Sequence, residues 1–166
     1  MRKAPPPYGT ATFCDDFRQE VGNKVTLVGV YSGDMTFPQG VTFPLGIPKL
    51  VVRGTWVEST DTDLNEITFK VGIRKFDSDP DADDDQAFGE IRFDAPDIKA
   101  VREQRPDTKN PLLFLNPVFM LSPCFIPFPG LLRVRALRNG EWWAISGLSI
   151  REPPKPDGDS PQSAAE

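Results

Sequence analysis

The chain has 166 residues, of which 39% are hydrophobic and 26% charged, and it carries a net charge of −5, two Cys and no His. This apolar content is enough to bury the core of one domain and argues against disorder along the whole chain. Two Cys are too few for a disulfide-stapled secreted scaffold, and the lack of His removes Ser-His and Cys-His catalysis and every His-metal site. The acidic balance argues against general binding of nucleic acid.

The two ends of the chain are rich in proline and poor in large apolar side chains. Three consecutive prolines stand where the apolar segment of a signal peptide would follow, so we expect a cytoplasmic protein. We predict a disordered arm at residues 1–8, a single folded domain at 9–151, and a disordered, proline-rich acidic tail at 152–166. Cys14 and Cys124 sit among apolar neighbours, which predicts buried, free thiols.

Between the ends, runs of β-branched and aromatic residues predict strands. In chain order the expected strands cover residues 10–17, 24–32, 49–57, 66–74, 87–93, 131–138 and 141–150. The segment 24–32 is apolar on both faces, as a central strand would be, whereas 66–74 alternates and therefore has one wet face. Gly54 indicates a bulge within its strand.

The last two predicted strands are joined by Asn139-Gly140. This dipeptide best satisfies the positive φ that both turn residues of a type I′ hairpin require. With a two-residue loop, Arg138 faces Glu141, and the opposite charges support that register.

A single segment, residues 97–104, has helical character, and Asp94 or Asp97 can cap it. Helices between the other strands are missing, which argues against a parallel α/β fold. The sequence therefore predicts an all-β fold, an antiparallel β-sandwich of about seven or eight strands with one short helix.

The most apolar stretch, residues 112–132, is divided by prolines, four of which recur every six residues at positions 111, 117, 123 and 129. Each proline removes a backbone donor and clashes inside a helix, which rejects a membrane helix. In an extended chain this spacing places the prolines on one side. That predicts an edge strand or a polyproline-like crossover packed on the core.

Two interpretations of this proline-rich segment stand side by side. In the first, the segment is a crossover that only covers the core. In the second, it is an exposed apolar edge that docks a protein partner through side chains, because an edge without donors resists sheet growth. The side chains expected to make this contact are Phe114, Phe119, Phe125 and Phe128.

Trp142 and Trp143 form a second candidate partner-binding surface. They are consecutive on a predicted strand, so one of them faces outward from its sheet. An outward Trp beside Arg133 or Arg135 would be a stacking platform. The alternative is burial under the tail or under a neighbouring subunit.

An acidic loop, residues 77–85, connects two predicted strands. Its alternating carboxylates could gather Ca²⁺, a cation that takes several oxygens, through Asp77, Asp79, Asp81 and Asp83. The match to a helix-loop-helix calcium site fails, because Ala82 stands where glycine is needed and Phe88 where glutamate is needed. The other interpretation is a solvated, mobile loop.

The remaining carboxylate cluster is Asp15, Asp16 and Glu20. Asp15 and Asp16 face opposite sides of a strand and so do not form an acid-base pair, and a salt bridge to Arg18 or Arg133 is their expected role. The sequence has no G-x-S-x-G, P-loop, G-x-G-x-x-G or C-x-x-C motif. Because the usual proton-transfer residue is also missing, we predict a protein that is not an enzyme and uses no cofactor.

Residues 11–33, ATFCDDFRQEVGNKVTLVGVYSG, resemble the opening A-x-F-C-D-D-x-R-x-E-x-x-x-K-x-x-L-x-G-x-Y-S-G of a family of uncharacterised bacterial proteins, a domain of unknown function. The fitting positions are Cys14, Asp15, Asp16, Arg18, Glu20, Lys24, Leu27, Gly29, Tyr31, Ser32 and Gly33. Two later short stretches, residues 48–50 and 129–135, also resemble sequences of this family. The resemblance implies a small β-sandwich domain from bacteria or their mobile elements, with no catalytic residues to transfer.

Together these patterns predict a non-enzymatic protein-binding or assembly module of bacterial or prophage origin. The expected partner is a protein, either a second copy or another chain, and neither nucleic acid nor a membrane. The alternative is a calcium-dependent, ligand-binding sandwich that uses the acidic loop. The expected location is the cytoplasm, or a virion if a phage carries the gene.

Overall fold

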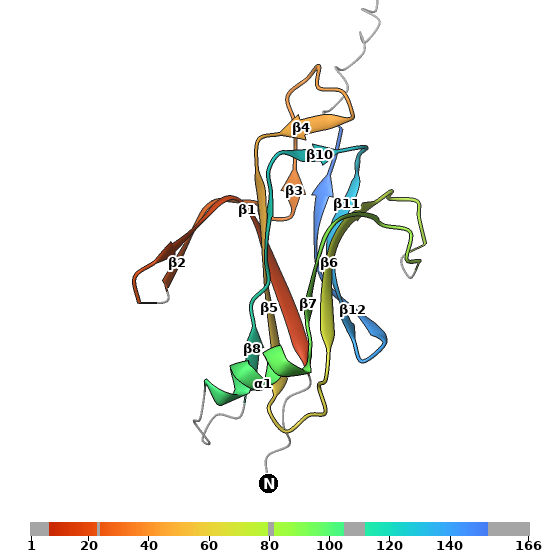
Figure 1. Cartoon of the computed structure of the whole chain (residues 1–166). Coiled ribbons are helices and arrows are strands. Elements are labelled where there is room, and N and C mark those ends of the chain that lie inside the picture. The colour runs from red at the N-terminus through yellow and green to blue at the C-terminus, as the bar shows by residue number, and fades with distance from the viewer. Residues whose placement is uncertain (1–6, 23, 80–81, 105–111, 153–166) are drawn as a thin grey trace, which may run out of the picture.

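The computed structural model describes residues 7–22, 24–79, 82–104 and 112–152. These ranges contain twelve strands and one helix, so the predicted all-β class with one short helix is confirmed (Figure 1). There are more strands than the predicted seven or eight. The proline-rich segment divides into short strands, and two further short strands precede residue 50.

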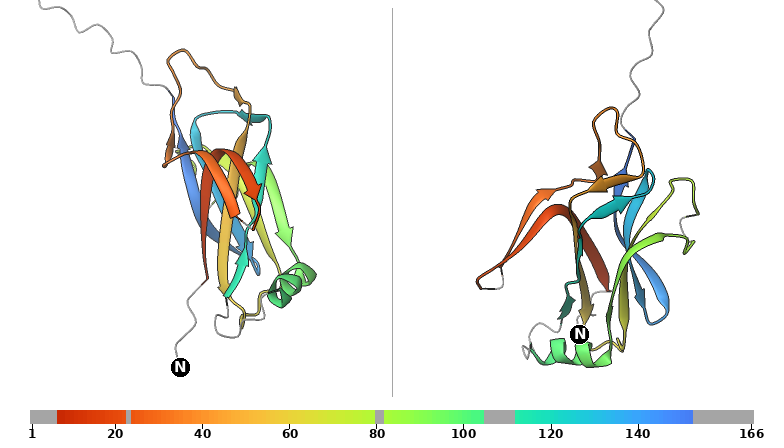
Figure 2. Two further views of the ribbon diagram at one scale, coloured as in Figure 1. Left: turned by 90° about the vertical axis from the view of Figure 1, so that its left-hand side faces the viewer. Right: turned by 45° about the horizontal axis from the view of Figure 1, so that its top comes forward.

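Five strands form sheet A, and all of its pairs are antiparallel. In spatial order they are β2 (Lys24–Val30), β1 (Tyr8–Glu20) and β5 (Leu50–Ser59), followed by β8 (Leu112–Leu115) and β9 (Val118–Leu121), which both pair with β5. β1 pairs with β5 only up to Cys14 and with β2 from Cys14 onward. The outer half of β1 and all of β2 therefore leave the body as a hairpin arm, residues 15–22 and 24–30 (Figures 1 and 2).

Five more strands form sheet B. In spatial order they are β3 (Asp34–Met35), β12 (Glu141–Ile150), β11 (Gly130–Arg138), β6 (Ile67–Arg74) and β7 (Gln86–Phe93). β3 pairs with β12 in parallel, and the other pairs are antiparallel. β4 (Leu45–Ile47) and β10 (Cys124–Ile126) form a separate two-stranded sheet. The predicted hairpin turn is confirmed, with φ of 47° at Asn139 and 85° at Gly140, and with Arg138 paired to Glu141.

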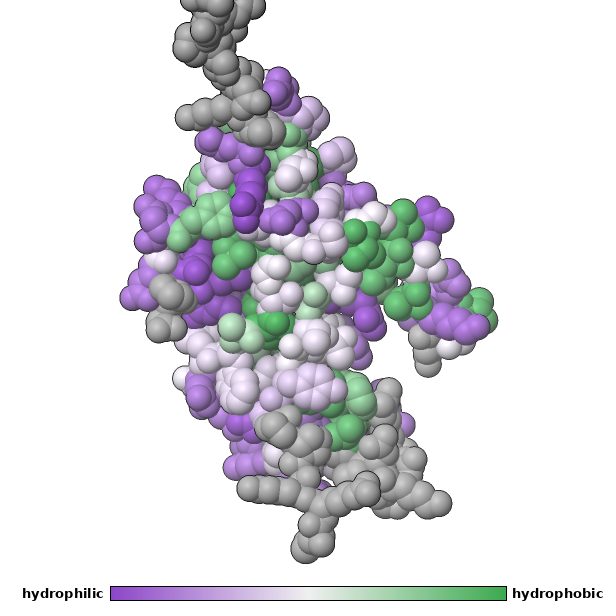
Figure 3. Space-filling model, turned by 180° about the vertical axis from the view of Figure 1, so that it is seen from behind, coloured by the Kyte–Doolittle hydropathy of each residue, from purple (hydrophilic) through white to green (hydrophobic). Residues whose placement is uncertain are grey.

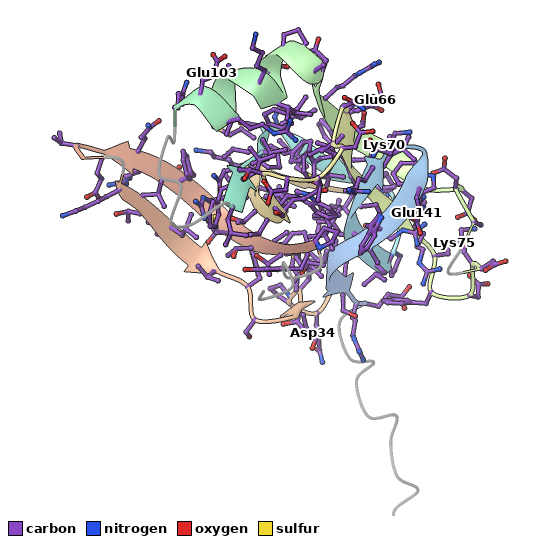
Figure 4. All side chains as sticks on the ribbon, turned by 90° about the horizontal axis from the view of Figure 1, so that it is seen from below. Asp34, Glu66, Lys70, Lys75, Glu103 and Glu141 are labelled. Carbon is purple, nitrogen blue, oxygen red and sulfur yellow. The ribbon has the colours of Figure 1, made fainter. Side chains whose placement is uncertain are left out.

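The core lies between sheets A and B, where the side chains crowd together in the view from below (Figure 4). Trp56 of β5 packs edge to face on Phe69 of β6 and on Trp143 of β12, with ring centroids 6.4 and 5.7 Å apart. Such aromatic pairs add about 0.5–1.5 kcal/mol each beyond the burial of their surface. Cys14 and Cys124 are buried, free thiols, as predicted.

A buried ion pair ties the two sheets together. Glu58 of β5 is 1% exposed, and it accepts hydrogen bonds at 3.0 Å from Arg138 Nε of β11 and from Trp56 Nε1. Burial alone would raise the pKa of Glu58, but these donors hold the pKa below its ordinary value. The carboxylate therefore stays charged inside the protein, and loss of either partner would leave the other charge unpaired.

Helix α1 (Ala95–Glu103) contacts β7 and β8 at one end of the molecule. It begins two residues before the predicted segment 97–104, because Asp94 is the N-cap. The carboxylate of Asp94 accepts from the Asp97 N–H at 3.3 Å, and the carboxylate of Asp97 accepts from the Asp94 N–H at 3.2 Å. This reciprocal capping box satisfies two donors that the first turn would otherwise leave unpaired.

The boundaries of the predicted domain need one correction. Tyr8 is the first residue of β1 and pairs with Val57, because the ladder with β5 reaches that far, so the predicted disordered arm at residues 1–8 is too long. The remainder of that arm up to residue 6, and the tail from residue 153, lie outside the described residues. Disorder there stays a prediction.

Candidate interaction surface

Within the proline-rich segment, β8 and β9 form one edge of sheet A, as an edge strand would, whereas the later residues pass through β10 to β11 of sheet B. β8 and β9 pair with successive parts of β5, and Pro117 separates them. The Gly54 N–H of β5 donates to the Pro117 carbonyl at 2.8 Å, and a Cβ on Gly54 would lie 2.8 Å from Pro117 Cγ. Gly54 therefore marks a close approach rather than the predicted bulge, since the register of β5 continues unbroken through it.

The four phenylalanines of this segment do not gather on one exposed surface, so that prediction is wrong. Phe119 is 5% exposed and belongs to the core, because alternation along β9 turns it inward and turns Met120 outward. Phe114 and Phe128 are half-buried. Of the four, only Phe125 is largely exposed, at 64%.

The two tryptophans point to opposite faces of β12, as predicted. Trp143 packs against the core beside Trp56. Trp142 lies on the outer face of sheet B, where Arg135 Cζ is 4.0 Å and Lys70 Nζ is 5.1 Å from the centroid of its ring. The expected stacking of Trp142 with an arginine is present, so two cations of the same chain already contact the indole ring.

The acidic loop covers the two arginines of β11. Asp85 accepts from Arg133 Nε at 2.9 Å, and Asp83 pairs with Arg135 at 3.4 Å. The Ala82 carbonyl accepts from both guanidinium groups, at 2.8 and 3.1 Å. Arg133 and Arg135 are consequently only 8% and 5% exposed. The predicted alternative bridge from Arg133 to the N-terminal aspartates is wrong, because those aspartates lie on the other sheet.

A shallow hollow, open to solvent, lies between this loop and Trp142. Its charged lining groups pair with one another or with their neighbours: Lys70 lies 3.6 Å from Glu90, and Arg135 lies 3.7 Å from Asp85. The hollow is therefore explained as the gap between sheet B and the acidic loop that covers its arginines.

The same contacts bear on the predicted calcium site. Asp81 lies outside the described residues, and Asp83 already faces Arg135. Within the described ranges, no three Asp, Glu or Cys side chains come close enough together to hold a metal ion. The geometry thus gives the calcium alternative, with its ligands Asp77, Asp79, Asp81 and Asp83, no support.

Residues of the N-terminal motif build the root of the hairpin arm. Asp15 accepts a hydrogen bond from the Tyr31 hydroxyl at 2.5 Å, and burial together with this carboxylate raises the pKa of Tyr31 to about 12. Gly29 has a φ of 66°, and a Cβ there would lie 2.0 Å from Asp15 Oδ2. Glycine is thus required at this position both by its backbone conformation and by the carboxylate that crosses it.

Asp16 fixes the opposite side of the root. The Lys49 ammonium and Arg18 Nε, the latter at 3.2 Å, donate to its carboxylate and lower the pKa of Asp16 to about 2. The predicted bridge between Asp16 and Arg18 is therefore present, and Lys49 is a partner that sequence analysis missed. The paired aspartates of the motif position the arm where it leaves the body.

The outer strand of the arm, β2, exposes apolar side chains. Val25, Val28 and Val30 are 38%, 44% and 54% exposed, and Val21 at the tip is 96% exposed. The prediction of a central strand at 24–32 is wrong, because the arm leaves the body and β2 has a neighbour, β1, on one side only in the described structure. Figure 3 shows hydrophobic surface gathered on the arm.

The other sheet edges of the described structure are protected. β9 directly follows Pro117 and ends one residue before Ser122-Pro123, and β3 has only two residues. The edge strand β7 carries Glu90 and Arg92, which pair with Lys70 at 3.6 Å and with Glu66 at 2.6 Å. β2 has no charged residue after Lys24. It is therefore the edge with the least protection against pairing with another strand.

The chain was also compared with known proteins. No model of a protein family matches it, and no curated protein does. The resemblance of residues 11–33 to a family of uncharacterised bacterial proteins stays a prediction. Among the described residues, no helix has the length and apolar character needed to cross a bilayer.

Proposed function

We propose that this chain is a non-enzymatic protein-binding module that binds another polypeptide by strand addition to the free edge of β2. The observation that carries the proposal is the combination on one strand of three exposed valines and an edge that has no neighbour among the described residues. In strand addition, main-chain hydrogen bonds provide affinity and alternate side chains provide specificity. β2 offers both, on an arm that projects from the body (Figure 1).

The chemistry of the polar side chains supports a binding role over catalysis. The thiols of Cys14 and Cys124 are buried, and desolvation raises the pKa of each, which disfavours the nucleophilic thiolate. The carboxylates of Asp16 and Glu58 are held by cations that stabilise the fold. A bacterial or prophage setting rests on the resemblance of residues 11–33 alone.

Site-specific photo-cross-linking tests the proposed function. A photoreactive amino acid replaces Val28 of the full chain. In a control chain it replaces Met120, which is 64% exposed on the opposite edge of sheet A, formed by β8 and β9 and here called the proline-bounded edge. Both chains are irradiated in a lysate of the organism that carries the gene. We expect a polypeptide adduct at position 28 that is lost when Val30→Lys is added, and none at position 120. Equal yields at both positions, or no adduct at 28, would contradict the proposal.

A further inference from the structure

We infer that the polypeptide that adds to β2 is a second copy of this chain, and that two β2 strands pair antiparallel about a two-fold axis to form a dimer. This inference rests on the proposed function and names its partner. Two arms that overlap in this way would join two copies of sheet A into one continuous sheet.

Closure favours a second copy because, in the part of the chain that the structure describes, sheet A has one edge open to pairing. A two-fold axis satisfies that edge on both chains at once, so the assembly stops at two chains. The opposite edge is formed by β8 and β9 with Pro117 between them, and prolines there lack the donors that further growth would need. The arm also projects from the body, away from the other strands of sheet A (Figure 2).

The register follows from the side-chain pattern of β2. An axis perpendicular to the sheet keeps each side chain on its own face, so residues of the same parity face one another. An axis through Thr26 places Thr26 opposite its own copy and Val25 opposite Leu27 of the second chain. It places Lys24 opposite Val28 of the second chain. In this register Val25 faces an apolar side chain and Val28 faces the stem of a lysine, whereas Val30 lies opposite Gly22 of the second chain.

The charges of the arm fit this register. On β1, Glu20 pairs with Lys24 and Asp16 pairs with Val28, which gives two separate rows within one chain. Across the axis the row becomes Glu20, Lys24, then Val28 and Asp16 of the second chain. Lys24 then has Glu20 of its own chain on one side and Val28 of the second chain on the other, with the carboxylate of Asp16 beyond that valine, and no like charges stand directly opposite. The positive charge of Lys24 is thereby compatible with the row of side chains that the second chain presents.

A pair of substitutions of opposite sign tests the register. Val28→Lys would place an ammonium directly opposite Lys24 of the second chain, twice per dimer, whereas Val28→Glu would place a carboxylate there. Molar mass is measured by light scattering over a wide range of protein concentration, with Met120→Lys as the control on the proline-bounded edge. We expect a wild-type mass of twice 18.5 kDa at high concentration. Val28→Lys should raise the dissociation constant at least about tenfold, Val28→Glu less, and Met120→Lys not at all.

A disulfide across the axis gives a second readout. Opposed residues of an antiparallel pair have Cα atoms about 4.5–5.5 Å apart, within the range of about 4.4–6.8 Å that a disulfide spans. Thr26→Cys should therefore form a covalent dimer on oxidation, whereas Val21→Cys at the tip should not. The native Cys14 and Cys124 are 0% and 2% exposed, so they do not compete.

The outcomes separate this inference from the proposed function. A monomer at all concentrations, or a dimer that Val28→Lys leaves intact, would overturn pairing between two β2 strands. If the adduct at position 28 then contains another polypeptide, strand addition stands with a different partner. Absence of both the dimer and any adduct at position 28 would overturn the inference and the proposed function together.

Discussion

Sheet A has two edges that are built in opposite ways. At one edge the chain runs as β8 and β9, and Pro117 interrupts it where Gly54 of β5 allows a close approach. At the other edge β2 leaves the body on a hairpin arm with its valines exposed. The first edge is rich in apolar residues but buries or half-buries all of them except Met120. The second has fewer apolar residues but exposes them, so exposure and free backbone, rather than apolar content, identify the interaction surface.

The largest expected effect concerns the ion pair that joins β5, the strand next to the proline-bounded edge, to sheet B. Glu58→Ala removes the buried carboxylate that joins β5 to Arg138 of sheet B and leaves a half-buried guanidinium without this partner. The free energy of unfolding should fall by about 3–5 kcal/mol. Urea denaturation measures the change, with Glu90→Ala, which breaks an exposed pair, as a control expected to lose at most about 1 kcal/mol. Equal losses in the two variants would show that β5 does not depend on this ion pair.

The next effect would disturb the proline-bounded edge itself. Gly54→Ala places a Cβ 2.8 Å from Pro117 Cγ, so β9 or Pro117 must move. We expect a loss of about 1–3 kcal/mol in unfolding free energy and faster amide exchange in β9. Gly46→Ala is the matched control, because its new Cβ meets only the exposed ring of Phe125 at 3.2 Å. A small loss in Gly54→Ala, similar to that of the control, would contradict the close approach.

A smaller effect would act on the arm alone. Gly29→Ala combines a φ of 66° with a Cβ that would lie 2.0 Å from Asp15 Oδ2. Gly22→Ala has a φ of 80° but no atom within 4 Å of the new Cβ, so it carries the backbone cost of about 1 kcal/mol without the clash. Amide exchange in β2 should rise more in Gly29→Ala than in Gly22→Ala. Equal exchange would show that Asp15 does not hold the root of the arm.

The smallest effect is the pH dependence of the arm. The folded pKa of Asp16, about 2, lies below its ordinary value of 3.8, so this carboxylate stabilises the fold above about pH 4 and loses that contribution as the pH falls toward 2. The wild-type chain should therefore exceed Asp16→Asn in thermal stability at pH 5 by more than at pH 2. The contribution is modest, since the side chain of Asp16 is 30% exposed. A difference that stays constant between pH 5 and pH 2 would contradict the pairing with Lys49 and Arg18.

Local patterns in the sequence predicted the local structure well. The Asn139-Gly140 turn, the Asp94 cap and the opposite faces of Trp142 and Trp143 each depend on a few neighbouring residues, and each is present. The edge position of β8 and β9 was also predictable. Proline has no backbone N–H to donate, so a strand that contains or adjoins prolines is found at the edge of a sheet rather than between two neighbours.

Features that depend on distant parts of the chain could not be predicted in the same way. A strand that is apolar on both faces has the same pattern whether it lies in the centre of a sheet or on a projecting arm, so Lys24–Val30 was placed wrongly. The partner of Glu58 lies 80 residues further along the chain. The inward turn of Phe119 depends on its register with β5.

Amide hydrogen exchange at increasing protein concentration tests most directly the claim that β2 is the edge at which chains pair. The pairing of two β2 strands predicts that amides in Lys24–Val30 exchange more slowly as concentration rises, while amides in β8 and β9 exchange at a constant rate. The Val28→Lys variant should remove the concentration dependence. Exchange in β2 that does not change with concentration, or a slowing confined to β8 and β9, would contradict the account.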